Sequence, residues 1–202
     1  RRQLIASRLG EAHLAAGHVA QASEAIYLAL NLARDLGDAQ RVEAAELFLA
    51  QAELAQGRWA EVMRRAERTL PTATSALTTA TAEFLLATAY SLEGADLDAA
   101  TAHLQAAERA LNTAIAQGLV DQGRLAQVRF EMGTVAAQRG DLPAAVDFYR
   151  ESLALADAST SVERVQVGPY DGLWLEGGPH VVMVESRGDS YEDRGRLAGN
   201  TL

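Results

Sequence analysis

Four histidines, many carboxylates and a run of arginines are the residues of this chain that could support chemistry. The histidines, His13, His18, His103 and His180, form no HExxH motif and no paired spacing of the kind that binds zinc. Only His13 and His18 lie close together in the sequence, and we expect a structural role for both. We therefore predict no metal site and no cofactor.

Motifs for nucleophilic catalysis and phosphate binding are also absent from the sequence. The chain has no cysteine, which excludes thiolate nucleophiles, thiolate metal sites and disulfides. It contains no Walker loop, no G-x-S-x-G elbow and no G-x-G-x-x-G loop. Its carboxylates fall where the solvated faces of helices are expected. We predict that the protein is not an enzyme.

The stretch "RWAEVMRRAER" gathers several arginines within eleven residues. These cations could hold an acidic partner, or they could pair with acidic residues three or four positions away on the same helix. We favour the second interpretation because glutamates are interleaved with the arginines. The residues concerned are Arg58, Arg64, Arg65 and Arg68, with Glu61 and Glu67 between them.

Composition and charge narrow the class of protein. The 202 residues carry a formal net charge of -9, and all 18 basic residues are arginine. Phosphate binding needs a basic face, so we expect no nucleic-acid partner. No stretch is apolar for long enough to span a membrane, and neither end of the chain has the features of a natural terminus, so we expect a piece of a longer polypeptide. The absence of Lys beside abundant Ala, Arg and Gly is typical of a GC-rich bacterial genome.

The elements that would position any functional residue are alanine-rich helices, which repeat along the chain from residue 1 to residue 159. Four segments have apolar residues at helical spacing, then a turn glycine, then a second amphipathic stretch. The turn glycines are Gly17, Gly57, Gly94 and Gly140. A Thr-rich stretch, "PTATSALTTATAE", is expected to be a loop that leads into the third hairpin, with Thr or Ser as its helix cap.

This pattern resembles the tetratricopeptide repeat (TPR) family. The first unit matches through Gly10, His13, Gly17, Ala22, Ile26 and Ala29, and the last through Gly133, Ala136, Gly140, Ala145, Tyr149 and Ser152. Looser matches are Ala50, Glu53, Gly57, Val62 and Ala66, and then Ala87, Tyr90, Gly94, Ala100 and Leu104. The resemblance implies an α-α superhelix of about four hairpins, whose lengthened repeats are similar to those in bacterial signalling ATPases and transcription regulators.

The resemblance also implies a groove for a peptide or partner helix along the first helices of the hairpins. The family's groove positions fall on Ser7, Glu11, Gln51, Phe84, Thr88, Phe130, Thr134 and Gln138. Two phenylalanines among small polar residues suit a partner with apolar anchors and a few hydrogen-bonding groups. The alternative is that Phe84 and Phe130 only pack between neighbouring hairpins, and we favour this packing interpretation for the two rings.

Residues 160–202 have a different composition. Only one of the 41 alanines but seven of the 16 glycines lie here, and "VERVQV", "GLWLE" and "HVVMVE" are short β-rich runs. They predict a short antiparallel β meander from Val162 to about Glu185. The predicted fold class is therefore mostly α, with the superhelix at residues 1–159 followed by a partial β domain at residues 160–202.

The run "GLWLEGGPHVVMV" and the later "RLAGNTL" are similar to the sensor-like carboxy-terminal domain of bacterial anti-sigma-factor-like proteins. The matching positions are Gly172, Trp174, Glu176, Gly177, Pro179, His180, Arg196, Leu197, Ala198, Gly199, Asn200, Thr201 and Leu202. In that family the domain usually lies outside the membrane. We expect Trp174 to anchor a small core and His180 to be a turn residue. Residues 1–159 and 160–202 are either joined directly in the native protein or are separate stretches of it.

Two functions follow from these observations. The first is an interaction scaffold, with a protein or peptide partner and a cytoplasmic location for the repeat domain. The second is part of a signalling or transcription regulator of the anti-sigma-factor type, in which the β segment is the sensor and the protein is tethered outside the cytoplasm. The sequence predicts neither the oligomeric state nor the identity of the partner.

Overall fold

The computed structural model describes residues 1–94, 96–120, 122–158, 162–167, 170–175 and 183–185. The chain divides into two compact units, Arg1–Ser159 and Thr160–Leu202. Each unit is described by itself below.

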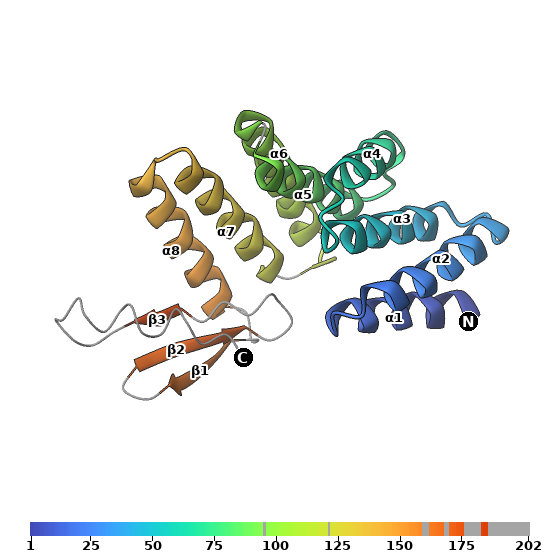
Figure 1. Cartoon of the computed structure of the whole chain (residues 1–202), viewed down its shortest axis with the longest axis horizontal. Coiled ribbons are helices and arrows are strands. Elements are labelled where there is room, and N and C mark those ends of the chain that lie inside the picture. The colour runs from blue at the N-terminus through green and yellow to red at the C-terminus, as the bar shows by residue number, and fades with distance from the viewer. Residues whose placement is uncertain (95, 121, 159–161, 168–169, 176–182, 186–202) are drawn as a thin grey trace. The chain divides into compact units, whose positions relative to one another are not determined.

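The first unit consists of four helical hairpins, coloured from blue to orange in Figure 1. Each hairpin is a first helix, a turn and a second helix. The pairs are α1 (Arg2–Ala15) with α2 (Val19–Asp35), α3 (Ala39–Leu54) with α4 (Trp59–Thr69), α5 (Ala76–Glu93) with α6 (Leu97–Ala116), and α7 (Gly123–Gln138) with α8 (Leu142–Ala158). A single 3-10 turn, η1 (Leu70–Thr72), follows α4. The four predicted hairpins are thus confirmed.

The helix ends are formed by residues suited to them. Gly94 ends α5 in the left-handed conformation with φ 71°, which costs glycine little, and the other three predicted turn glycines also have positive φ. Ser75 caps α5 by accepting a hydrogen bond from the Thr78 amide at 3.0 Å, which confirms the predicted Ser or Thr cap. Asp38 and Asp96 cap α3 and α6 in the same way.

Small residues let the two helices of a hairpin approach closely. The backbone of Gly10 lies against Ile26 of α2, so that a Cβ added at Gly10 would overlap the Ile26 side chain. Gly133 of α7 makes the same kind of approach, because an added Cβ would lie 2.6 Å from Cε1 of Tyr149 in α8. Both positions match small residues of the TPR pattern. The pattern therefore marks where helices cross.

Three apolar clusters join each hairpin to the next. One contains Ile26 and Leu30 of α2 with Leu49 of α3. The second joins α3 and α4 to α5, and the third joins α5 and α6 to α7. The first helices also contact one another in sequence order, α1 with α3, α3 with α5 and α5 with α7. The first helices consequently form a layer that runs through all four hairpins.

The second unit contains three short strands, β1 (Val162–Val167), β2 (Tyr170–Leu175) and β3 (Met183–Glu185). Their backbones pair antiparallel in the order β1-β2-β3. Residues 176–182, between β2 and β3, and the chain from residue 186 onward lie outside the described residues. The structure describes none of the side chains of this unit.

The predicted fold class therefore has to be corrected. The part of the chain whose side chains are described is built from helices alone, so the fold is an all-α helical repeat. The predicted fold class added a β meander, as a folded domain, to the helical repeat. Such a domain is not shown, and this part of the prediction was wrong. The physical reason is that alternation of apolar and polar residues is a local signal, whereas a small stable sheet also needs a core, which alternation alone does not specify.

Candidate functional site

The predicted groove residues all lie on the layer of first helices. Ser7 and Glu11 are on α1, Gln51 is on α3, Phe84 and Thr88 are on α5, and Phe130, Thr134 and Gln138 are on α7. They are spread along four helices and do not gather into one cluster. Such a distribution suits an extended ligand better than a small molecule.

The two phenylalanines take part in packing. Phe84 packs, partly buried, against the cluster that contains Ala87 and Leu104. The ring of Phe130 lies 5.4 Å from the ring of Tyr149 in α8, at an angle of 46°. Both rings are only partly buried, so each has a packing side and a side that faces solvent.

The polar groove residues on α5 and α7 are largely engaged within the protein. The Thr88 hydroxyl donates to the carbonyl of Phe84 at 2.9 Å, and Thr88 is buried. Thr134 donates to the carbonyl of Phe130 at 3.2 Å. Gln138 exchanges hydrogen bonds with Ser91, which joins α7 to α5. Thr88 is therefore poorly placed to contact a partner.

The groove residues on α1 and α3 have the same intermediate exposure as Phe84, Phe130 and Thr134, whereas Gln138 on α7 is exposed. Ser7, Glu11 and Gln51 are all partly exposed. The carboxylate of Glu11 accepts a hydrogen bond from the Arg8 guanidinium at 2.7 Å on the same helix. In this half of the layer the side chains of Ser7 and Gln51 are partly open to solvent.

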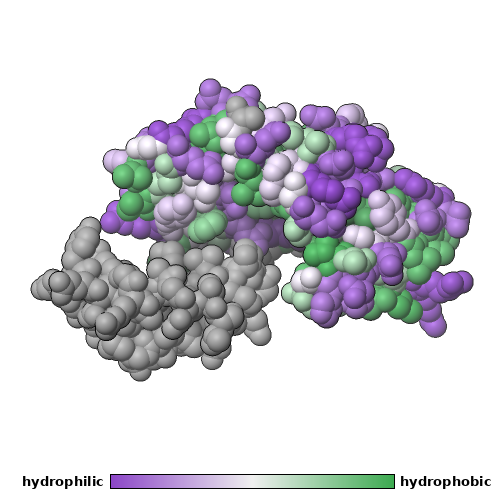
Figure 2. Space-filling model, viewed as in Figure 1, coloured by the Kyte–Doolittle hydropathy of each residue, from purple (hydrophilic) through white to green (hydrophobic). Residues whose placement is uncertain are grey.

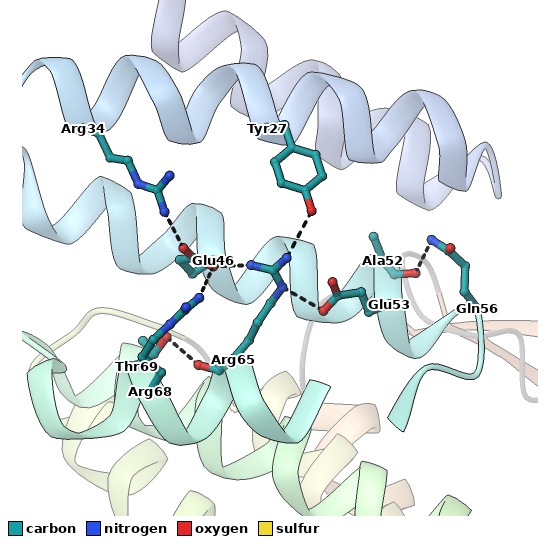
Figure 3. Close-up of polar contacts among 9 residues, drawn as sticks. All are labelled: Tyr27, Arg34, Glu46, Ala52, Glu53, Gln56, Arg65, Arg68 and Thr69. Carbon is teal, nitrogen blue, oxygen red and sulfur yellow. Dashed lines mark hydrogen bonds and ion pairs between the residues drawn. The ribbon is translucent and has the colours of Figure 1, made fainter. Parts of the chain in front are cut away.

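An ionic cluster with a buried centre, which we call the Arg65 cluster, joins α2, α3 and α4 (Figure 3). Its members are Tyr27, Arg34, Glu46, Glu53, Arg65 and Arg68. Arg65 donates from Nε to Glu53 Oε2 at 2.8 Å, from Nη1 to Glu46 Oε2, and from Nη2 to the Tyr27 hydroxyl at 3.1 Å. Glu46 also accepts from Arg34 at 2.9 Å and from Arg68 at 3.2 Å.

Arg65, Glu46 and Glu53 are 8%, 6% and 5% exposed. Burial by itself lowers the pKa of Arg65, but the hydrogen bonds and negative charges of Glu53 and Glu46 outweigh it and raise the pKa above its ordinary value. Arg65 therefore stays charged at any physiological pH. With every polar group of the trio paired, the cluster has the properties of a structural connection between helices rather than a ligand site.

The ion pairs of this cluster differ from those predicted from the sequence. We expected Arg65 and Arg68 to pair with Glu61 and Glu67 along α4, but they pair with Glu46 and Glu53 on α3. The available signal was the spacing of Glu46 and Glu53, seven residues apart and thus on one face of a helix whose neighbouring residues are Ala and Leu. Carboxylates on an otherwise apolar face need buried cations as partners.

A cavity of about 270 Å³ lies between α6, α7 and α8. Its wall includes Leu104, Met132 and Phe148 together with Arg129. The Arg129 guanidinium is paired with Glu108 and, at 3.2 Å, with Glu151, and it lies 5.9 Å from the centre of the Phe148 ring. Arg139 also lines the cavity and pairs with Asp98, so both arginines of the wall are paired with the protein's own carboxylates.

The histidines do not form a metal site within the described part of the chain. The rings of His13 and His18 are 5.8 Å apart, and His103 Nδ1 lies 2.6 Å from Glu83 Oε2 while its ring stacks on Tyr90. Residues 1–94, 96–120, 122–158 and the three strands contain no group of three or more potential metal ligands. Within the same residues, no helix has the length and hydropathy needed to cross a membrane.

No protein-family model matches the chain, and no curated protein matches its sequence. Solved structures do resemble it. The apo form of RapI superposes with a TM-score of 0.62 at 12% identity, over 78% of this chain and 56% of RapI. BtubC from P. vanneervenii superposes with a TM-score of 0.55 at 21% identity, over 82% of this chain and 68% of BtubC.

These likenesses show the fold, a helical repeat, and at such low identity they show nothing about activity. This chain spans only 56% of the length of RapI. The helical repeat fold that the resemblance to the tetratricopeptide family implied is thereby supported. Membership of that family is not shown, because no family model matches. For the anti-sigma-factor-like domain no match is found, and the motif residues 176, 177, 179, 180 and 196–202 lie outside the described residues.

Proposed function

We propose that this protein is an interaction scaffold that binds an extended peptide or a helix of a partner protein along the layer formed by α1, α3, α5 and α7. The function is one of binding, without catalysis. The observation that carries the proposal is the continuity of this layer, in which each first helix contacts the next. A ligand laid across it would meet all four hairpins.

The side chains on this layer suggest the chemistry of the partner. The solvent-facing sides of Phe84 and Phe130 could receive apolar side chains of the ligand. The amide of Gln51 could donate and accept hydrogen bonds with a ligand backbone. No arginine is among the predicted groove residues, so a partner that docks through its own carboxylates is disfavoured.

Site-specific crosslinking tests the proposal. p-Benzoylphenylalanine would be introduced in place of Ser7 or Gln51 on the first helices and, as matched controls, in place of Gln21 on α2 or Glu67 on α4, which are exposed. The proposal predicts that light produces an adduct with the same protein from both first-helix sites and not from the controls. Adducts of equal yield from both sets of positions, or none from Ser7 and Gln51, would refute it.

The proposal includes a cytoplasmic location for the repeat domain. Fractionation of cells that express a tagged full-length protein would check this. Recovery of the protein in the membrane or extracytoplasmic fraction would contradict it and would favour the regulator that the C-terminal motif predicts.

A further inference from the structure

The four first helices can be compared position by position, because Gly10, Ala50, Ala87 and Gly133 occupy equivalent places in the repeat. Each helix has three further positions that lie together on one face. They are five residues before, one residue before and two residues after the equivalent place. In α1 they are Ile5, Leu9 and Ala12. In the other first helices they are Ala45, Leu49 and Ala52, then Ala82, Leu86 and Ala89, then Val128, Met132 and Val135.

Inside the array this face is always covered. All nine residues at these positions in α3, α5 and α7 are buried, with none more than 7% exposed. The covering element is the second helix of the preceding hairpin. Leu49 clusters with Ile26 and Leu30 of α2, Leu86 with Val62 and Ala66 of α4, and Met132 with Leu104 and Leu111 of α6.

On α1 the same face is open in the described structure. Ile5 is 66% exposed, Leu9 is 50% exposed, and Ala12 is also exposed. Leu4, beside them on the helix, is 56% exposed. Figure 2 shows hydrophobic surface over the first hairpin. Contiguous apolar side chains of this size on one helix face are typical of an interface.

Charges around the face are consistent with the same kind of neighbour. At the interface between α6 and α7, acidic residues of the covering helix pair with arginines, Glu108 with Arg129 of α7 and Asp98 with Arg139, which directly follows α7. On α1 two arginines, Arg2 and Arg8, are exposed, and Arg8 already pairs with Glu11 on the same helix at 2.7 Å. A covering helix with acidic residues beside its apolar stripe would therefore be complementary in charge as well as in hydropathy.

We propose that the Ile5–Leu9–Ala12 face of α1 is a docking surface for the second helix of a further helical hairpin of the same architecture. The occupant is an amphipathic helix with small and aliphatic residues at helical spacing and an acidic flank, packed as α2, α4 and α6 pack on the helices that follow them. This surface is separate from the groove of the proposed function and does not depend on it.

A fusion protein can present such a helix in register. In α7, Gly123 is ten residues before Gly133, and Arg1 is nine residues before Gly10. A copy of residues 75–123 placed directly before Arg1 thus gives its second helix the same spacing to α1 that α6 has to α7. The experiment compares the melting temperature and helical circular dichroism of the full chain with and without this addition.

Because stacked repeats stabilise one another through their interfaces, the fusion is expected to melt cooperatively and at a temperature on the order of 5 °C higher. The same fusion with Ile5→Glu and Leu9→Glu should lose this gain. Without the fusion these two changes should alter the melting temperature little, because both side chains are already exposed. Leu36→Glu is the matched control, since Leu36, which directly follows α2, is 63% exposed and its replacement should leave the gain intact.

Three results would overturn the proposal. The first is a gain in melting temperature that persists in the Ile5→Glu, Leu9→Glu fusion, because the added hairpin would then act elsewhere. The second is no gain, or an added segment that contributes no helical signal, because α1 would then provide no docking surface. The third is a dimer of the unfused chain in sedimentation velocity that Leu9→Glu dissociates, because the occupant would then be a second copy.

Discussion

Replacing Arg65 by Met would remove the cation at the centre of the Arg65 cluster and leave a hydrophobic side chain of similar length. Glu53, which is 5% exposed, would lose the ion pair that Arg65 makes with it at 2.8 Å. Glu46 would keep Arg34 and Arg68 as partners. The substitution therefore creates one buried carboxylate without its ion pair, at the contact between α3 and α4.

Removing one partner of a buried ion pair typically costs about 3–5 kcal/mol, because the remaining charge is buried and uncompensated. For a domain of this size, each kcal/mol corresponds to a shift of roughly 2–4 °C in melting temperature. Arg65→Met should therefore lower the melting temperature of the repeat unit by roughly 6–20 °C. Differential scanning calorimetry and urea denaturation would measure the change.

Arg64 provides the control, because it is the preceding residue on α4 and is exposed. Arg64→Met should change the free energy of unfolding by less than about 0.5 kcal/mol. In the Arg65→Met background, Glu53→Gln should recover more than about 1 kcal/mol by removing the uncompensated charge. A loss of less than about 1 kcal/mol in Arg65→Met, or no recovery by Glu53→Gln, would refute this account of the cluster.

Two further substitutions test other parts of the structure. Gly10→Val should lower the free energy of unfolding, measured by chemical denaturation, by about 1–3 kcal/mol, because the valine side chain would overlap Ile26. Ala12→Val, on the exposed face of the same helix, is the control and should have a much smaller effect. Equal effects of the two changes would contradict the close approach of α1 and α2. Burial raises the pKa of Glu131, so its contribution to stability is present below the ordinary glutamate pKa of about 4.3 and is lost as the pH rises through the folded-state value. Glu131→Gln should consequently raise the melting temperature at pH 7 but not at pH 4. If the wild-type protein is instead more stable than Glu131→Gln at pH 7, the buried carboxylate does not destabilise the fold.

The helical hairpins could be predicted from the sequence because their signals are local. Apolar spacing marks each helix, and Gly17, Gly57, Gly94 and Gly140 provide the positive φ that ends the first helix of each hairpin. The small residues Gly10 and Gly133 mark helix crossings, and the structure places Ile26 and Tyr149 against them. Helix order then follows from the short connections.

The Arg65 cluster could not be predicted in the same way, because its partners are separated by 12 and 19 residues and meet only when α3 and α4 pack together. A pairing rule based on helical neighbours assigned Arg65 to Glu61 because it considered α4 alone. The C-terminal meander failed for a related reason, since alternation along a strand does not specify the core that a sheet requires. The groove residues remain a prediction, although Thr88 is more buried than that role would favour.

Hydrogen–deuterium exchange of the protein with a partner recovered by crosslinking tests the central claim most directly. If the ligand lies along the first helices, binding should slow amide exchange in α1, α3, α5 and α7 while leaving α2, α4 and α6 near their rates in the free protein. Slowed exchange confined to the second helices, with none in α3 and α5, would contradict the claim that this chain is a scaffold that binds through its first-helix layer.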